Sequence, residues 1–106
     1  MSKKIKIEAS SGNVFLDLGF DPAEAENLRL RSLLMIRITT MVRDSKWTQS
    51  EAAGLFGVTQ PRLNLLLKGK IQLFSLDALV NMLSQAGMRV NMTVKKAAWR
   101  IEAQFG

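Results

Sequence analysis

The chain contains no cysteine and no histidine, and these absences exclude several common chemistries. Without cysteine there is no disulfide, no thiol nucleophile and no thiolate ligand for zinc. Without histidine, the usual general base at neutral pH and a frequent metal ligand are also missing. We therefore expect a protein that is not an enzyme, holds no metal ion and needs no cofactor.

Long hydrophobic runs are also lacking, although apolar residues make up 47% of the sequence. No run reaches the roughly eighteen apolar residues that a membrane-spanning helix needs. The basic N-terminal residues 1–8 are not followed by the apolar stretch of a signal peptide. We expect a cytoplasmic protein with no membrane partner, and 106 residues suit one small domain.

Acidic residues become scarce in the second half of the chain. Residues 1–51 hold eight basic and seven acidic residues, whereas residues 52–101 hold seven basic residues and only Asp77 as an acid. The formal net charge of +6 therefore belongs almost entirely to the second half. This asymmetry has two interpretations: ordinary scatter over a solvated surface, or a half of the molecule that faces a polyanion.

Two short helices joined by a tight turn are predicted between residues 48 and 67. Thr48 and Glu51 have the spacing of a capping box, so the first helix begins near residue 49. Gly57 permits the left-handed backbone that ends this helix, and Thr59 can cap a second helix over residues 60–67. This arrangement is typical of a DNA-binding helix-turn-helix, whose second helix enters the major groove.

Polar residues at the start of the second helix are the candidates for reading DNA sequence. Recognition helices meet base edges through their early turns, which here carry Gln60, Arg62 and Asn64. Arg62 can grip guanine with two hydrogen bonds, and Gln60 or Asn64 can pair with adenine. The alternative for each is an ordinary surface side chain.

Four further residues are candidates for contacts with DNA phosphates, which set affinity and salt dependence without reading sequence. Gln49 and Thr59 stand at helix starts, where side chains and backbone amides commonly hold phosphates. Lys68 and Lys70 flank Gly69 just beyond the second helix. The alternative for the two lysines is a solvated turn.

The remaining segments predict a mainly helical fold. Asp21 and Pro22 begin a helix that should reach about residue 44, with Leu33 and Ile38 among the apolar residues of one buried stripe. Ser75 can cap a further helix over residues 76–86. Residues 88–95 alternate strictly between apolar and polar, which predicts a β-strand in need of a partner strand. Residues 97–106 fit either a short helix or a disordered tail.

The chain divides into an N-terminal arm (residues 1–20), a helix-turn-helix DNA-binding domain (residues 21–87) and a C-terminal strand and tail (residues 88–106). Ile5 and Ile7 hint at a short strand, and residues 14–20 are too apolar to remain solvated. The arm therefore packs onto the domain or onto a partner. The residues that we expect at a partner or dimer contact are Val14, Phe15, Leu18, Val90 and Met92.

Several phrases of the sequence together resemble a known family. The stretch from Thr48-Gln49 to Gly69 looks like the Xre/Cro-type repressor domain. Additional phrases resemble its branch of small HigA-type antitoxins: Ser10-Ser11-Gly12-Asn13-Val14-Phe15, Asp17-Leu18-Gly19, Gln60-Pro61, Leu67-Lys68-Gly69-Lys70, Phe74-Ser75-Leu76 and the alternating terminal segment. The resemblance covers roughly residues 8 to 96. The expected fold is an all-α, λ-repressor-like bundle of four to five helices, with an N-terminal arm and a short C-terminal β-strand.

The resemblance implies a sequence-specific repressor that acts as a homodimer on double-stranded DNA. Two-fold symmetry would make its operator an inverted repeat. It also implies an antitoxin that represses its own operon and neutralises a RelE-like ribonuclease toxin. The alternative is a stand-alone phage-type regulator without a toxin, and the residues alone do not separate the two.

Overall fold

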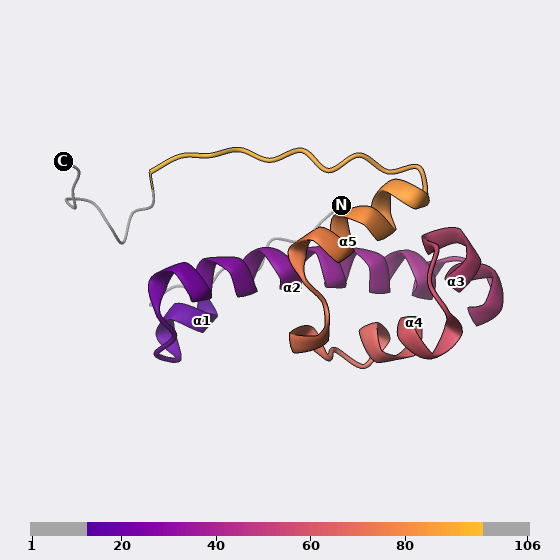
Figure 1. The fold of residues 1–106 in the computed structure, drawn as a ribbon, viewed down its shortest axis with the longest axis horizontal. Helices are drawn as coiled ribbons and strands as arrows, with labels where there is room; N and C mark the ends of the chain where they lie inside the picture. Colours follow the sequence, from indigo (N-terminus) through magenta and orange to yellow (C-terminus); the bar gives the residue numbers. More distant parts are fainter. Residues whose placement is uncertain (1–12, 97–106) are drawn as a thin grey trace.

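The computed structural model describes residues 13–96. Within this range the chain forms five α-helices and one short 3-10 helix, which confirms the predicted helical fold. Figure 1 shows α2 as a long rod, with α1 near one end, α3 and α4 near the other, and α5 across the middle. The elements are α1 (Val14–Asp17), α2 (Pro22–Asp44), α3 (Gln49–Phe56), α4 (Gln60–Leu67), η1 (Ile71–Leu73) and α5 (Leu76–Gln85).

The long helix α2 begins and ends where the sequence predicts. The Asp21 side chain accepts a hydrogen bond from the backbone N–H of Ala23, and Pro22 occupies the first helical position. Proline suits this position because the first backbone N–H groups of a helix have no intrahelical partner. None of the helices in residues 13–96 is both long and apolar enough to cross a membrane.

One expectation about α2 is wrong, because its apolar residues do not form a single buried stripe. Ile38 is completely buried, but Leu33 is 49% exposed and Ile36 is exposed as well. Leu33 precedes Ile38 by five residues, which places the two side chains about 140° apart around an α-helix. Only one face of α2 therefore contributes to the core, and part of a second apolar face stays in contact with solvent.

The main core lies where α2, α3, α4 and α5 meet. Its largest fully buried side chains are Phe56, Phe74, Ile38, Leu63, Leu66 and Leu79. Ala52 and Ala53 are buried on α3, where their small side chains let neighbouring helices approach closely. Both helices of the predicted pair thus contribute to the core, which fixes them relative to α2 and α5.

The arm contains a short helix that the sequence did not predict. The Asn13 side-chain oxygen accepts hydrogen bonds from the backbone N–H groups of Phe15 and Leu16 and so caps α1. The same side chain is buried, and its amide nitrogen donates to the Ala25 carbonyl oxygen at 3.2 Å. This contact ties α1 to α2. The strand hinted by Ile5 and Ile7, and the tail after residue 96, lie outside the described residues.

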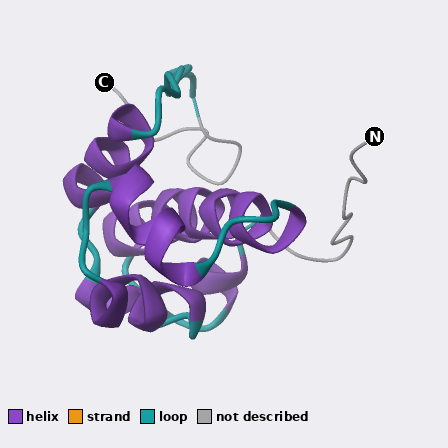
Figure 2. Ribbon diagram, turned by 90° about the vertical axis from the view of Figure 1, so that its right-hand side faces the viewer, coloured by secondary structure: helices purple, strands orange, loops and turns teal. Residues whose placement is uncertain are grey.

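The predicted C-terminal β-strand does not form within the described residues. Residues 88–96 leave α5 as an extended segment without regular secondary structure. Figure 2 likewise shows only helices and loops in the described part of the chain. A β-strand needs the backbone of a second strand for its hydrogen bonds, and residues 13–96 provide none. Alternation predicts which face of a segment is apolar, but not whether a partner strand is present.

Candidate nucleic-acid interface

The first helix of the pair, α3, begins with the predicted capping box. The backbone N–H of Glu51 donates to Thr48 Oγ1 at 3.0 Å, and the backbone N–H of Thr48 donates to Glu51 Oε1 at 2.9 Å. Just before this cap, Trp47 packs edge-on against Phe56, with the ring centroids 6.3 Å apart. The residues before α3 therefore contact its last residue, which stabilises the entry to the helix pair.

The turn between α3 and α4 depends on Gly57. Its φ angle of 71° lies in the left-handed region, and the Val58 N–H donates to the Ala53 carbonyl oxygen at 2.9 Å. This six-to-one hydrogen bond is the mark of a Schellman ending. A Cβ atom on Gly57 would also lie 3.2 Å from Gln85 Cγ, since α5 lies close behind the turn. Both the backbone angle and the space favour glycine at this position.

The second helix, α4, begins at the predicted cap. Thr59 Oγ1 accepts a hydrogen bond from the Arg62 backbone N–H at 3.2 Å, and Pro61 lies in the first turn. Because a hydroxyl has one donor and two acceptor lone pairs, the Thr59 O–H can still donate to a phosphate oxygen. The cap and the phosphate contact that we predict for this residue are therefore compatible.

The outward side of α4 carries polar side chains at regular spacing. Leu63 and Leu66 point into the core and are completely buried or nearly so. Gln60, Asn64 and Lys68 follow one another every four residues, so they line one edge of α4 that extends to its C-cap, Lys68. Gln60 and Lys68 are exposed, and Asn64 is half-buried. We call these three residues the polar edge of α4.

Arg62 lies differently from the polar edge. Its guanidinium carbon is 4.1 Å from the centroid of the Phe74 ring, which is a cation–π contact. Phe74 is completely buried, and its carbonyl oxygen accepts a hydrogen bond from Arg31 Nη1 at 3.4 Å. Arg62 therefore links α4 to the segment before α5. Sequence reasoning missed this contact because its two partners are twelve positions apart, with no local pattern to join them.

The four candidates for phosphate contacts are all exposed: Gln49, Thr59, Lys68 and Lys70. They lie at the start of α3, at the start of α4 and in the turn that follows α4. No acidic residue occurs between Ala52 and Lys70 along the chain. A polyanion approaching α4 would meet no carboxylate from this stretch.

The predicted partner-contact residues fall into two separate groups. In α1, Leu18 is 69% exposed and Val14 is exposed, while Phe15 packs edge-on against Phe20 with the ring centroids 6.2 Å apart. In the C-terminal segment, Val90 packs against the core and Met92 is 56% exposed. Figure 1 shows α1 near the end of α2 that lies far from α3. The α1 group therefore lies away from α3.

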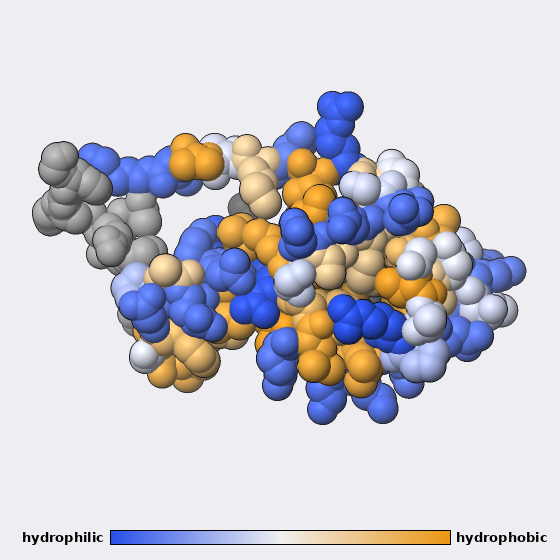
Figure 3. All heavy atoms as spheres, in the orientation of Figure 1, coloured by the Kyte–Doolittle hydropathy of each residue, from blue (hydrophilic) through white to orange (hydrophobic). Residues whose placement is uncertain are grey.

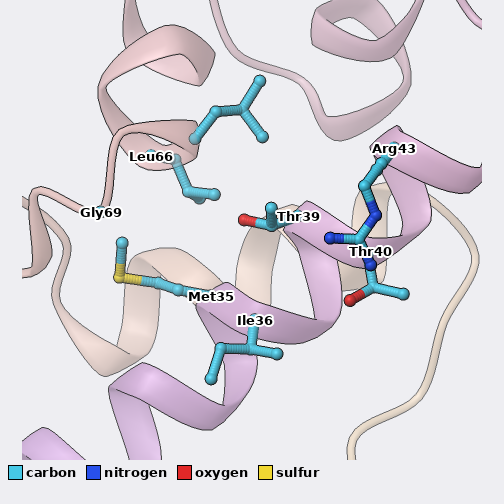
Figure 4. Close-up of a pocket in the computed structure, with 8 residues that line it drawn as sticks. Met35, Ile36, Thr39, Thr40, Arg43, Leu66 and Gly69 are labelled. Carbon is cyan, nitrogen blue, oxygen red and sulfur yellow. The ribbon is translucent and has the colours of Figure 1, made fainter.

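A shallow groove of about 230 Å³ lies between α2 and the end of α4. Figure 4 shows Thr39, Thr40 and Arg43 on α2, with Leu66 and Gly69 across from the helix. The residues that line the groove are Met35, Ile36, Thr39, Thr40, Arg43, Leu66, Leu67 and Gly69. Sequence reasoning missed this groove because its walls come from helices that are distant in the sequence. It contains no carboxylate, and the part of the chain that the structure describes holds no cluster of potential metal ligands.

Comparison with known proteins agrees with this geometry. Residues 14–95, which include the five α-helices of the described range, match a family described as a helix-turn-helix domain. A comparison with curated proteins finds no match. Because the family match extends over most of the sequence and includes the capped pair α3–α4, the chain belongs to this family of helix-turn-helix DNA-binding domains.

Proposed function

We propose that this protein is a sequence-specific transcriptional repressor of the Xre/Cro type that inserts α4 into the major groove. The observation that carries the proposal is the polar edge of α4, which faces outward from a helix whose opposite side is anchored in the core. The major groove of B-DNA is wide enough to admit an α-helix, and recognition helices contact bases through their first turns. Gln60 and Asn64 occupy those turns.

The two kinds of contact have different tasks. Gln60 and Asn64 would pair with adenine, and Arg62 would grip guanine after exchanging the Phe74 ring for a base. Phosphates would be held by the side chains at the helix starts and in the turn after α4: Gln49, Thr59, Lys68 and Lys70. Base contacts then set specificity, whereas phosphate contacts set affinity and its dependence on salt.

The proposed active form is a homodimer on an inverted-repeat operator. A two-fold axis would place two copies of α4 in successive major grooves, about 34 Å apart. Each copy would then read one half of the operator. A single copy would bury few base contacts, so dimerisation is needed for tight and selective binding.

Selection of bound duplexes from a random DNA pool tests the proposal directly. At two salt concentrations, the selection reports sequence preference, half-site spacing and the electrostatic share of the affinity together. We expect an inverted repeat with half-sites about one helical turn apart. A pool that shows no enriched sequence would contradict the assignment of α4 as a recognition helix.

Two substitutions separate base contacts from phosphate contacts. Asn64→Ala should cost about 1–3 kcal/mol of discrimination at one base position. Lys70→Ala should weaken binding to all duplexes alike and flatten the salt slope by about one unit. Fluorescence anisotropy with the selected duplex and a scrambled duplex measures both effects. Equal loss on the two duplexes for Asn64→Ala would assign Asn64 to affinity rather than to specificity.

Arg62 needs a separate test, because it also contacts Phe74. Arg62→Ala should relax one base preference by about 1–3 kcal/mol, and Arg62→Lys should do the same because an ammonium cannot form the bidentate fork. Urea unfolding without DNA measures the loss of the Phe74 contact independently. If both variants keep the base preference, Arg62 acts in the fold and does not read DNA.

We further propose that the protein is an antitoxin that represses its own operon and neutralises a RelE-like toxin. The support is the resemblance of the sequence to HigA-type antitoxins together with the exposed apolar side chains of α1, Val14 and Leu18. Leu18→Ser should abolish rescue of cells that express the neighbouring toxin, while operator binding stays unchanged. If no toxin gene adjoins this gene, the second candidate, a stand-alone phage-type regulator, replaces the antitoxin.

A further inference from the structure

The segment after α5 has an apolar face that is only half covered. Met88 and Val90 pack against the core, but Met92 is 56% exposed and Val94 is 96% exposed. Side chains two residues apart lie on the same side of an extended segment, so these four residues form one continuous face. Figure 3 shows the outer part of this segment standing away from the body of the molecule, with hydrophobic and hydrophilic residues along it.

The backbone hydrogen bonding of this segment is also incomplete. The Met88 N–H donates to the Leu83 carbonyl oxygen at 2.9 Å and ends α5. Beyond it, residues 89–95 form no hydrogen bond in the structure. An extended segment with unused backbone donors and acceptors and an alternating apolar face is a strand edge that can pair with another chain.

We propose that a second copy of this chain supplies the missing strand. In this arrangement the two 88–95 segments pair antiparallel around a two-fold axis at Asn91 and form a two-stranded ribbon that joins the dimer. This inference adds a contact surface to the homodimer of the proposed function. It rests on the proposed function only for the existence of that dimer. It assigns the dimer surface to the C-terminal segment.

The sequence of the segment is complementary to itself in this register. Antiparallel pairing centred on Asn91 places Met88 opposite Val94 and Val90 opposite Met92. Every apolar residue then faces an apolar residue of the other copy, on one side of the ribbon. Such cross-strand pairs are the main source of stability in an antiparallel sheet.

Charge repulsion excludes one neighbouring register, and the end of α5 excludes the other. Centring on Asn91 places Arg89 opposite Thr93, so no like charges face each other. Centring on Met92 instead places Arg89 opposite Lys95, and like charges directly opposite one another destabilise a pair of strands. Centring on Val90 places Val94 opposite Ala86, which lies at the end of α5 and outside the extended segment.

The ribbon also explains why the apolar face is half covered in a single chain. In the Asn91-centred register, Met92 and Val94 lie beside the residues of the other copy that contact its core. Met92 and Val94 of each copy would therefore extend the apolar surface that packs against the core of the other copy. A contact in which the same patch serves both copies is the usual form of a two-fold interface.

Cysteine scanning tests the register, because the natural chain contains no cysteine to interfere. In the proposed ribbon, the two copies of an Asn91→Cys variant have Cα atoms within the 4.4–6.8 Å range that a disulfide spans. The matched control is Thr93→Cys, whose two copies would be about 13 Å apart along the ribbon. We expect Asn91→Cys to form disulfide-linked dimers at least about tenfold faster than Thr93→Cys under mild oxidation.

Other outcomes of the scan overturn the proposal. Fastest cross-linking at Val90→Cys or Met92→Cys would move the two-fold axis and contradict the Asn91 register. Equal rates at all four positions would indicate random collision and contradict the ribbon. Asn91, Met92 and Thr93 are exposed, so their cysteine variants leave the core intact, and circular dichroism checks the fold of Val90→Cys, whose side chain packs against the core.

Sedimentation equilibrium provides the second measurement. The wild-type chain should be dimeric at micromolar concentrations, and Val94→Asp should raise its dimer dissociation constant by at least about tenfold, since it places charges opposite Met88 on both copies. Val94→Ile is the matched control and should remain dimeric. A wild-type chain that stays monomeric, or a Val94→Asp variant that stays dimeric, would overturn the ribbon.

These results are distinguishable from failure of the proposed function. A cross-linked Asn91→Cys dimer that shows no sequence preference in the duplex selection would contradict the repressor but retain the ribbon. A chain that selects an inverted repeat, but cross-links no faster at Asn91→Cys than at Thr93→Cys, would retain the repressor and place the dimer contact elsewhere.

Discussion

The α3–α4 turn and the segment after α5 differ in where their hydrogen-bond partners lie. At the turn, Thr48, Thr59 and the backbone around Gly57 form hydrogen bonds to residues at most five positions away. Residues 89–95 form none in the described chain. The hydrogen bonds of the first region are complete within its own residues, whereas those of the second need another strand. Substitutions at the turn should therefore change the stability of one chain, and substitutions in the segment should change association.

The largest effect is expected at Gly57. Gly57→Ala should lower the free energy of unfolding by about 1–2 kcal/mol, because alanine in the left-handed region is strained and its Cβ would crowd Gln85. Urea unfolding at two protein concentrations should show the same loss, since the strain is internal to one chain.

A matched control for Gly57→Ala lies in the same helix. Gly54→Ala adds a Cβ with nothing within 4 Å, so it should stabilise α3 by about 0.5–1 kcal/mol. If both variants change the stability in the same direction and by the same amount, the left-handed backbone is not the reason for glycine at position 57.

Loss of the α4 cap should have the next largest effect. Thr59→Ala removes the oxygen that accepts from the Arg62 N–H, which should cost about 1 kcal/mol of unfolding free energy. Thr59→Ser keeps the oxygen and should stay close to wild type. Thermal or urea unfolding without DNA measures both, and an Ala variant as stable as the Ser variant would show that the cap does not stabilise the turn.

A smaller, pH-dependent effect is expected at Glu26, in the second turn of α2. A hydrogen bond from Arg29 lowers the pKa of the Glu26 carboxyl below its ordinary value of 4.5. A lowered pKa contributes stability above the ordinary value, and this contribution is lost as the pH falls through the lowered pKa. Both side chains are more than a third exposed, so Glu26→Gln should cost only about 0.2–0.5 kcal/mol at pH 7.

The test for Glu26 is urea unfolding at pH 7 and at pH 3. The difference between wild type and Glu26→Gln should be present at pH 7 and shrink toward zero in acid. A difference that persists unchanged at the lower pH would show that packing of the glutamate stem, and not the ion pair, is responsible.

The smallest effect on a single chain is expected at Val94. Because this side chain is 96% exposed, Val94→Ser should change the unfolding free energy of the dilute, monomeric chain by less than about 0.5 kcal/mol. At high protein concentration the wild type should gain stability from association, and the variant should gain less. A clear loss in the dilute chain would mean that Val94 packs within its own copy.

The sequence predicts the starts of these helices well, because N-terminal capping depends on residues that are close together in the sequence. Asp21, Thr48, Thr59 and Ser75 all accept the hydrogen bonds expected of N-terminal caps. The helix α1 was missed, because its cap residue, Asn13, also occurs in loops, and its burial depends on contact with Ala25. The prediction that Leu33 is buried is wrong, because apolar spacing does not show which of two helix faces meets the core.

In the candidate site, too, features set by residues close in the sequence could be predicted, whereas contacts between distant segments could not. The polar edge of α4 could be predicted, since it needs only a helix start and the 3.6-residue period. The contact of Arg62 with Phe74 could not, because it depends on how the segment before α5 returns to α4. Which of these residues contact DNA stays a prediction until duplex binding is measured.

The position of Trp47 supplies an optical probe of the molecule. Its indole contacts Phe56 and remains 37% accessible to water, so its fluorescence should respond when the neighbouring helices separate or when a duplex covers them. The chain has two tryptophans, and the other, Trp99, lies outside the described residues. A Trp99→Phe background would leave a single emitter, allowing unfolding and duplex docking to be followed without an attached dye.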